Sequence, residues 1–188
     1  MGLMVHSLSE FPANAERNYY LYVLRGSWDS DIEKALRNNL LAMSDAASRS
    51  NSAVIYGTEG KHFQNEVFSW HKINGEEAES LLPAILITTI HPNKFIDEND
   101  HFWRTNSPKN FMILIPLREV INSENNVVDV MRKIFSDIRS NKELSEFEVS
   151  KKLNRGRFGT FMDGIQLKPS FMGIGFDLKN IPKILKGN

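Results

Sequence analysis

The chain has 188 residues, of which 41% are hydrophobic and 24% charged, and its formal net charge is zero. This composition indicates a folded globular protein rather than a disordered chain, and the balanced charge argues against a general binder of polyanions. The absence of cysteine excludes disulfides, thiolate catalysis and thiolate metal ligands, and a cytoplasmic location is expected. No membrane span is expected, because every apolar run is far shorter than the roughly 20 residues that cross a bilayer.

The first ninety residues predict an alternation of strands and helices. Aromatic and apolar residues predict a strand over 19–25, and apolar residues spaced three and four apart predict a helix after it. Two shorter strands are expected over 53–57 and 66–73, then a short helix that stops before Pro83, then a buried strand over 84–90. This order is the βαββαβ pattern of a ferredoxin-like plait, which is the α+β fold predicted for this half.

The second half begins after a long polar stretch without periodicity. A strand is predicted over 111–117, an amphipathic helix over 127–138, and a hairpin around Asp163-Gly164. The order of elements suggests a degenerate second plait packed with the first as one globule, and the alternative is a single mixed sheet with helices on one face. The predicted parts are therefore an N-terminal extension (1–18), a ferredoxin-like half (19–90), a long polar loop (91–110) and a second α+β half (111–188).

The end of the chain is basic, although the whole chain is neutral. The segment from Lys151 onward carries eight cations and two anions, and two of its arginines alternate with glycines and Phe158. Glycine lets backbone amides approach an anion closely, and arginine binds phosphate through two parallel hydrogen bonds. We expect an anion site for a phosphate-bearing ligand or RNA here, and the alternative is a solvated basic surface. The candidate residues are Lys151, Lys152, Arg155 and Arg157.

Two histidines are candidates for general-base chemistry. His71 lies in the predicted strand 66–73, and His91 follows the predicted central strand, where a long loop begins. Either imidazole, together with a basic side chain, contains the groups that metal-independent cleavage of a phosphodiester needs. The alternative is that they are hydrogen-bonded structural residues. No spacing of ligand residues typical of metal sites occurs, so no metal or cofactor is expected.

The 91–110 loop contains an aromatic and basic triplet, Phe102-Trp103-Arg104. Tryptophan and arginine are enriched in the central contacts of protein interfaces. This triplet is therefore the predicted partner-contact site, and the alternative is packing within the loop.

These patterns favour a non-catalytic binding or regulatory module that contacts a protein partner or an anionic ligand. Two alternatives remain. One is a small metal-independent phosphodiesterase or nucleotide-acting enzyme that uses His71 or His91 as its base. The other is a structural subunit that forms oligomers through self-association.

Overall fold

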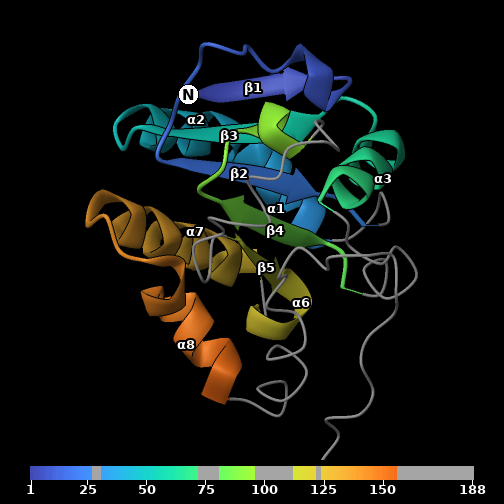
Figure 1. Cartoon of the computed structure of the whole chain (residues 1–188). Coiled ribbons are helices and arrows are strands. Elements are labelled where there is room, and N and C mark those ends of the chain that lie inside the picture. The colour runs from blue at the N-terminus through green and yellow to red at the C-terminus, as the bar shows by residue number, and fades with distance from the viewer. Residues whose placement is uncertain (27–30, 72–80, 96–111, 122–123, 156–188) are drawn as a thin grey trace, which may run out of the picture.

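The structure is a computed structural model that describes residues 1–26, 31–71, 81–95, 112–121 and 124–155. These residues form a five-stranded mixed sheet with helices on both faces (Figure 1). The strands are β1 (Gly2–Val5), β2 (Tyr19–Leu24), β3 (Ser52–Gly57), β4 (Ala84–Thr88) and β5 (Met112–Pro116).

The strand order in space is β1-β3-β2-β4-β5. β1, β3 and β2 run parallel, β4 pairs antiparallel with β2, and β5 pairs antiparallel with β4. β2 therefore lies in the middle of the sheet. β1 lies at one end of the described sheet and β5 at the other.

Helices cover both faces of this sheet. The first face is covered by α1 (Asp31–Asn38), α2 (Leu40–Ser48) and α7 (Glu124–Arg139). The second face is covered by η1 (Leu8–Glu10), α3 (Gly60–Trp70) and η2 (Pro92–Phe95). The chain continues from β5 through α6 (Leu117–Val120) to α7, and from α7 through η3 (Leu144–Glu146) to α8 (Glu148–Arg155). Among the described residues, no helix has both the length and the apolar character needed to cross a membrane.

The core lies on both sides of β2. Its side chains alternate, so Tyr19, Leu21 and Val23 face the first layer of helices, and Tyr20 and Tyr22 face α3. All six residues of β2 are buried. A strand buried on both faces is expected at the centre of a sheet between helices, and its apolar area is a main source of folding free energy.

The α+β class is confirmed, but the ferredoxin-like plait is not, because the strand order differs. The segment 66–73, predicted as a strand, belongs largely to α3. Phe63, Val67 and His71 recur every four residues and form one buried face of a helix, so the helical period outweighs the alternation seen in the sequence. Gly57 allows α3 to pack closely, since a Cβ there would lie 2.3 Å from Cβ of Phe63.

The other differences concern the strands at the two edges of the described sheet, β1 and β5. Gly2–Val5, predicted to lie in an extension, is strand β1 of the sheet. Met112–Pro116, predicted to open a second plait, pairs with β4 in that same sheet. The hairpin predicted around Asp163-Gly164 lies outside the described residues.

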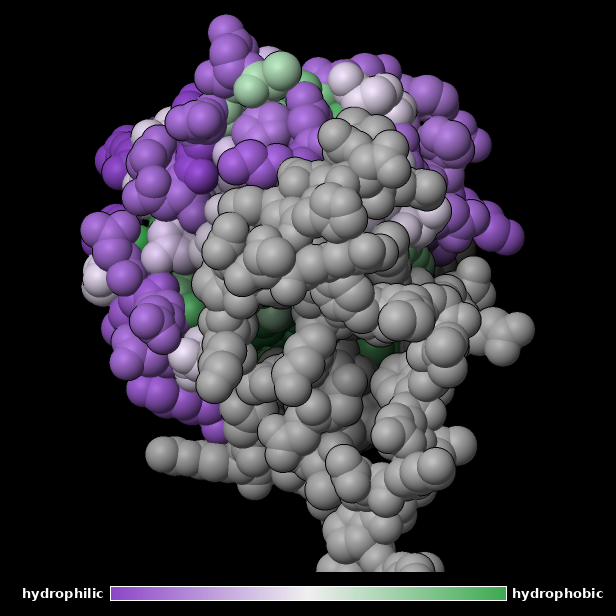
Figure 2. Space-filling model, in the orientation of Figure 1, coloured by the Kyte–Doolittle hydropathy of each residue, from purple (hydrophilic) through white to green (hydrophobic). Residues whose placement is uncertain are grey.

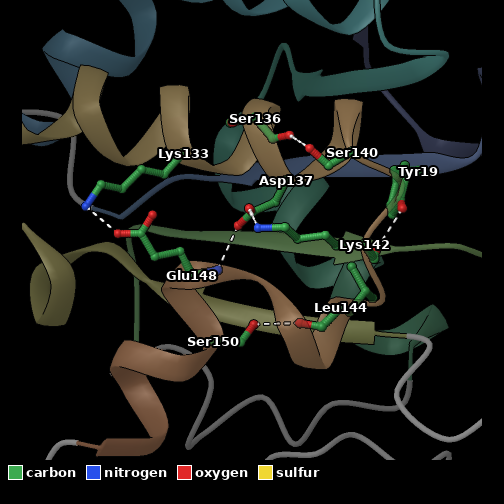
Figure 3. A network of polar contacts seen from close by, with 9 residues as sticks. All are labelled: Tyr19, Lys133, Ser136, Asp137, Ser140, Lys142, Leu144, Glu148 and Ser150. Atoms are coloured by element: carbon green, nitrogen blue, oxygen red, sulfur yellow. Dashed lines mark hydrogen bonds and ion pairs between the residues drawn. The ribbon is translucent and has the colours of Figure 1, made fainter.

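A buried carboxylate joins α7 to α8 (Figure 3). Asp137 is 4% exposed, and its Oδ1 accepts a hydrogen bond from Nζ of Lys142 at 2.5 Å. Its Oδ2 accepts one from the backbone N–H of Glu148 at 2.7 Å, in the first turn of α8. The hydrogen bond to Asp137 raises the pKa of Lys142. One side chain therefore satisfies both a lysine and a backbone donor of α8.

We expect Asp137→Ala to reduce the free energy of unfolding by about 1 to 3 kcal/mol, because it leaves a backbone donor of α8 without its acceptor. Chemical denaturation measures the loss, and faster hydrogen exchange at Glu148 locates it. Asp129→Ala, on the same helix, is the control. Its exposed pair with Arg132 should contribute no more than about 0.5 kcal/mol. Equal losses in both variants would contradict the assigned role of Asp137.

Candidate functional site

His71 is a buried, neutral imidazole at the end of α3. The residue is 3% exposed, and its Nδ1 lies 2.7 Å from the carbonyl oxygen of Val67. Its ring centroid lies 5.0 Å from that of Tyr22 and 3.9 Å from that of Phe95. Burial lowers the pKa of His71 to about 4, although the hydrogen bond to Val67 opposes this shift.

His91 packs on the same side of the sheet. Its Nδ1 accepts a hydrogen bond from the backbone N–H of Asn93 at 3.2 Å, and its ring centroid lies 5.4 Å from that of Tyr20 and 5.2 Å from that of Phe11. Burial lowers the pKa of His91 as well, and the positive charge of Lys94 acts in the same direction. His91 is therefore also a neutral, ring-packed imidazole at pH 7.

The structure thus brings the two predicted bases onto one face of the sheet. Tyr20 and Tyr22 are two residues apart on β2, and each contacts one histidine. We call these four residues the tyrosine–histidine cluster. Nε2 of both histidines is buried, and within the described part of the chain Nε2 of His71 and Oη of Tyr22 have no hydrogen-bond partner. A general base must reach the proton that it removes, so this geometry favours a structural role for both rings.

A buried ion pair lies at the carboxyl end of β2. Nε of Arg25 and Oε2 of Glu33 are 3.9 Å apart, and the two residues are 5% and 2% exposed. The guanidinium carbon of Arg25 lies 5.5 Å from the centroid of the Tyr56 ring. Gly60 leaves room for this side chain, since a Cβ there would lie 3.1 Å from Cδ of Arg25.

The position of this pair resembles that of ligand sites in other sheets. The chain leaves β2 toward α1 on the first face and leaves β3 toward α3 on the second. Open sheets often bind ligands where successive strands connect to opposite faces. Here the charge of Arg25 is balanced by Glu33. Removing one partner of such a buried pair strongly lowers the stability of the fold. The pair therefore anchors α1 to the sheet rather than presenting a net charge to an anion.

The open side of β1 is the most accessible apolar feature of the described structure. The carbonyl oxygen of Met1 accepts a hydrogen bond from the N–H of Val54 in β3, and that of Val5 accepts one from the N–H of Thr58, directly after β3. Alternation therefore turns the backbone groups of Gly2 and Met4 away from β3. Neither Gly2 nor Met4 makes a hydrogen bond on that side to any described residue. The Met4 side chain is 60% exposed.

Helix α2 adds a second exposed apolar side chain beside β1. Leu41 is 86% exposed, and a Cβ on Gly2 would meet Ser44 one turn further along α2. α2 runs back from β2 to β3 and is therefore antiparallel to β1, which places Leu41 nearer to Met4 than to Gly2. We call Gly2, Met4 and Leu41 the β1 edge surface. Figure 2 shows that the face of the molecule turned to the viewer is mostly hydrophilic where it is described.

The remaining predicted site residues lie mostly beyond what the structure describes. Lys151 is exposed on α8. Lys152 and Arg155 belong to α8, but their side chains are outside the described set. Arg157 and the triplet Phe102, Trp103 and Arg104 lie outside the described residues. Within the described ranges, no group of three or more histidine, aspartate or glutamate residues is placed to hold a metal ion.

Two of these features were missed by sequence reasoning. Glu33 is not among the candidate residues selected from the sequence, yet it is three residues from the buried Leu36 and shares its side of α1. The three-residue spacing can be read from the sequence, but the buried arginine that pairs with the carboxylate of Glu33 cannot. β1 was missed because four residues are too few for a periodic signal. No protein family, curated protein or solved structure matches this chain.

We expect Glu33→Ala to reduce the free energy of unfolding by about 3 to 5 kcal/mol, because it leaves Arg25 charged and buried. The double variant with Arg25→Met and Glu33→Met should lose clearly less. Denaturant titration of the singles and the double gives the coupling energy. Asp31→Ala, on the same helix, removes an exposed pair with Lys34 and should change little. Additive losses in the double variant would contradict a coupled buried pair.

His71 should make the stability depend on pH. Its pKa is about 4 in the folded state against the ordinary histidine pKa of 6.5, so its stabilising effect is complete above pH 6.5 and is lost as pH falls toward 4. We expect the free energy of unfolding to fall by about 2 kcal/mol between pH 7 and pH 5 from this group alone. His71→Gln should remove that dependence, whereas Tyr22→Phe should keep it. Urea titrations at the two pH values test this, and an unchanged dependence in His71→Gln would refute it.

Proposed function

We propose that this chain is a non-catalytic binding module that contacts a protein partner at the β1 edge surface. The observation that carries the proposal is the outward-facing backbone of Gly2 and Met4, flanked by the exposed side chains of Met4 and Leu41. An extended segment can add a strand to such an edge, with backbone hydrogen bonds providing affinity and side-chain contacts providing specificity.

The dimensions of the edge suggest a reversible contact. β1 has four residues, and only those between its start and His6 offer backbone groups, because the N–H of His6 donates to Oε2 of Glu10 at 3.0 Å. Short edge strands limit uncontrolled sheet pairing while still permitting a specific one. The exposed Met4 side chain is flexible and polarizable, which suits an adaptable contact.

The other proposals from the sequence have less support. The buried Nε2 atoms of His71 and His91 count against a phosphodiesterase that uses either residue as its base. A second contact with an anionic ligand through Lys151, Lys152, Arg155 and Arg157 rests on the composition of that segment alone.

The proposal predicts that the edge surface selects extended peptides. A displayed library of random peptides, selected on the wild-type chain, should yield sequences whose binding is lost with Met4→Lys and with Leu41→Lys. Isothermal titration with the selected peptides measures the loss. Arg132→Ala, an exposed position on α7, is the control and should bind normally. Selected peptides that bind both edge variants as well as the wild type would overturn the proposal.

A further inference from the structure

We infer that the strand received at the β1 edge surface is β1 of a second copy of this chain. This inference rests on the proposed function, which it extends by naming the partner. The pairing would be antiparallel about a twofold axis at Leu3, so that each copy presents the same surface to the other.

The backbone of β1 is self-complementary in that register. Gly2 and Met4 carry the outward N–H and C=O groups, and a twofold axis at Leu3 sets Gly2 of one copy opposite Met4 of the other. Directly opposed residues of this kind exchange both of their hydrogen bonds in an antiparallel ladder. The pairing satisfies every outward backbone group of Gly2 and Met4. It stops at His6, whose N–H is already bound to Glu10.

The side chains also fit this register. Gly2 has no side chain, and its position lies directly against Ser44 of α2. Because Ser44 fills the space over Gly2, the Met4 side chain of the second copy would lie at the outer flank of α2, next to Gly2 and not over it. Met4 is 60% exposed in the single chain, so this contact buries apolar area that the fold itself leaves in solvent.

The charges at the two ends of β1 are opposite. Nη2 of Arg17 lies 3.7 Å from Sδ of Met1, which places a cation near the start of the strand. Glu10 binds the N–H of His6 and places an anion at its end. Antiparallel pairing brings the start of one strand beside the end of the other. Arg17 of each copy then faces Glu10 of the other, and the twofold axis makes two such pairs. Because the net charge of the chain is zero, long-range repulsion between two copies is small.

The test is the oligomeric state of the full chain, measured by sedimentation equilibrium over a wide range of concentrations. The wild type should dimerise. Met4→Pro removes an outward N–H without removing a hydrogen bond to β3, and it should weaken the dimer by about tenfold or more. Circular dichroism checks whether Met4→Pro folds normally. If it does not, Met4→Lys replaces it as the test variant. A monomeric wild type at all concentrations, or a dimer that both variants leave unchanged, overturns the inference.

A charge swap tests the register. Glu10→Arg and Arg17→Glu should each weaken the dimer, and the double variant should restore it, because the opposite charges then meet again. Failure of the swap to restore any affinity overturns the antiparallel register. A wild type that stays monomeric yet binds library peptides at the edge refutes self-pairing while leaving the proposed function intact. A wild type that stays monomeric and also binds no peptide at the edge would refute both the self-pairing and the proposed function.

Discussion

The structure depends on the burial of β2 on both of its faces. All six residues of this strand are buried, with alternate side chains directed into two separate apolar layers. Because β2 pairs with β3 on one side and β4 on the other, its backbone groups are also satisfied. α1 and α7 share one apolar layer with this strand, and α3 shares the other.

Burial of β2 also explains why the polar groups of the interior are not an evident active site. Tyr20 and Tyr22 extend from the centre of the sheet, where His71 is buried against Tyr22 and the partly buried His91 packs on Tyr20. Arg25 continues the same strand and is enclosed at its end with Glu33. Buried groups of this kind have large effects on stability, but they do not meet an external substrate without a route to it.

Among the described residues, the side of the sheet farthest from β5 carries the exposed apolar side chains of Met4 and Leu41. Within the described part of the sheet, β1 pairs with β3 alone, and the outward backbone groups of Gly2 and Met4 bind no described residue. The backbone hydrogen bonds of an unpaired strand have defined directions, since donors and acceptors occur along it at fixed spacing. A second strand therefore fits there more specifically than a general apolar surface would, and a copy of the same strand supplies the matching pattern.

Sequence alone determined the α+β class, the central strands β2 and β4, and the apolar face of α1, α2 and α7, because burial leaves a periodic trace in neighbouring residues. Only the tertiary structure decided that 66–73 is largely helical, that β1 joins the sheet, and that His71 and His91 share a face with Tyr20 and Tyr22. These outcomes depend on contacts between residues far apart in the chain, such as β1 with β3 and Arg25 with Tyr56. Periodicity reports which side of an element is buried, but not which distant element buries it.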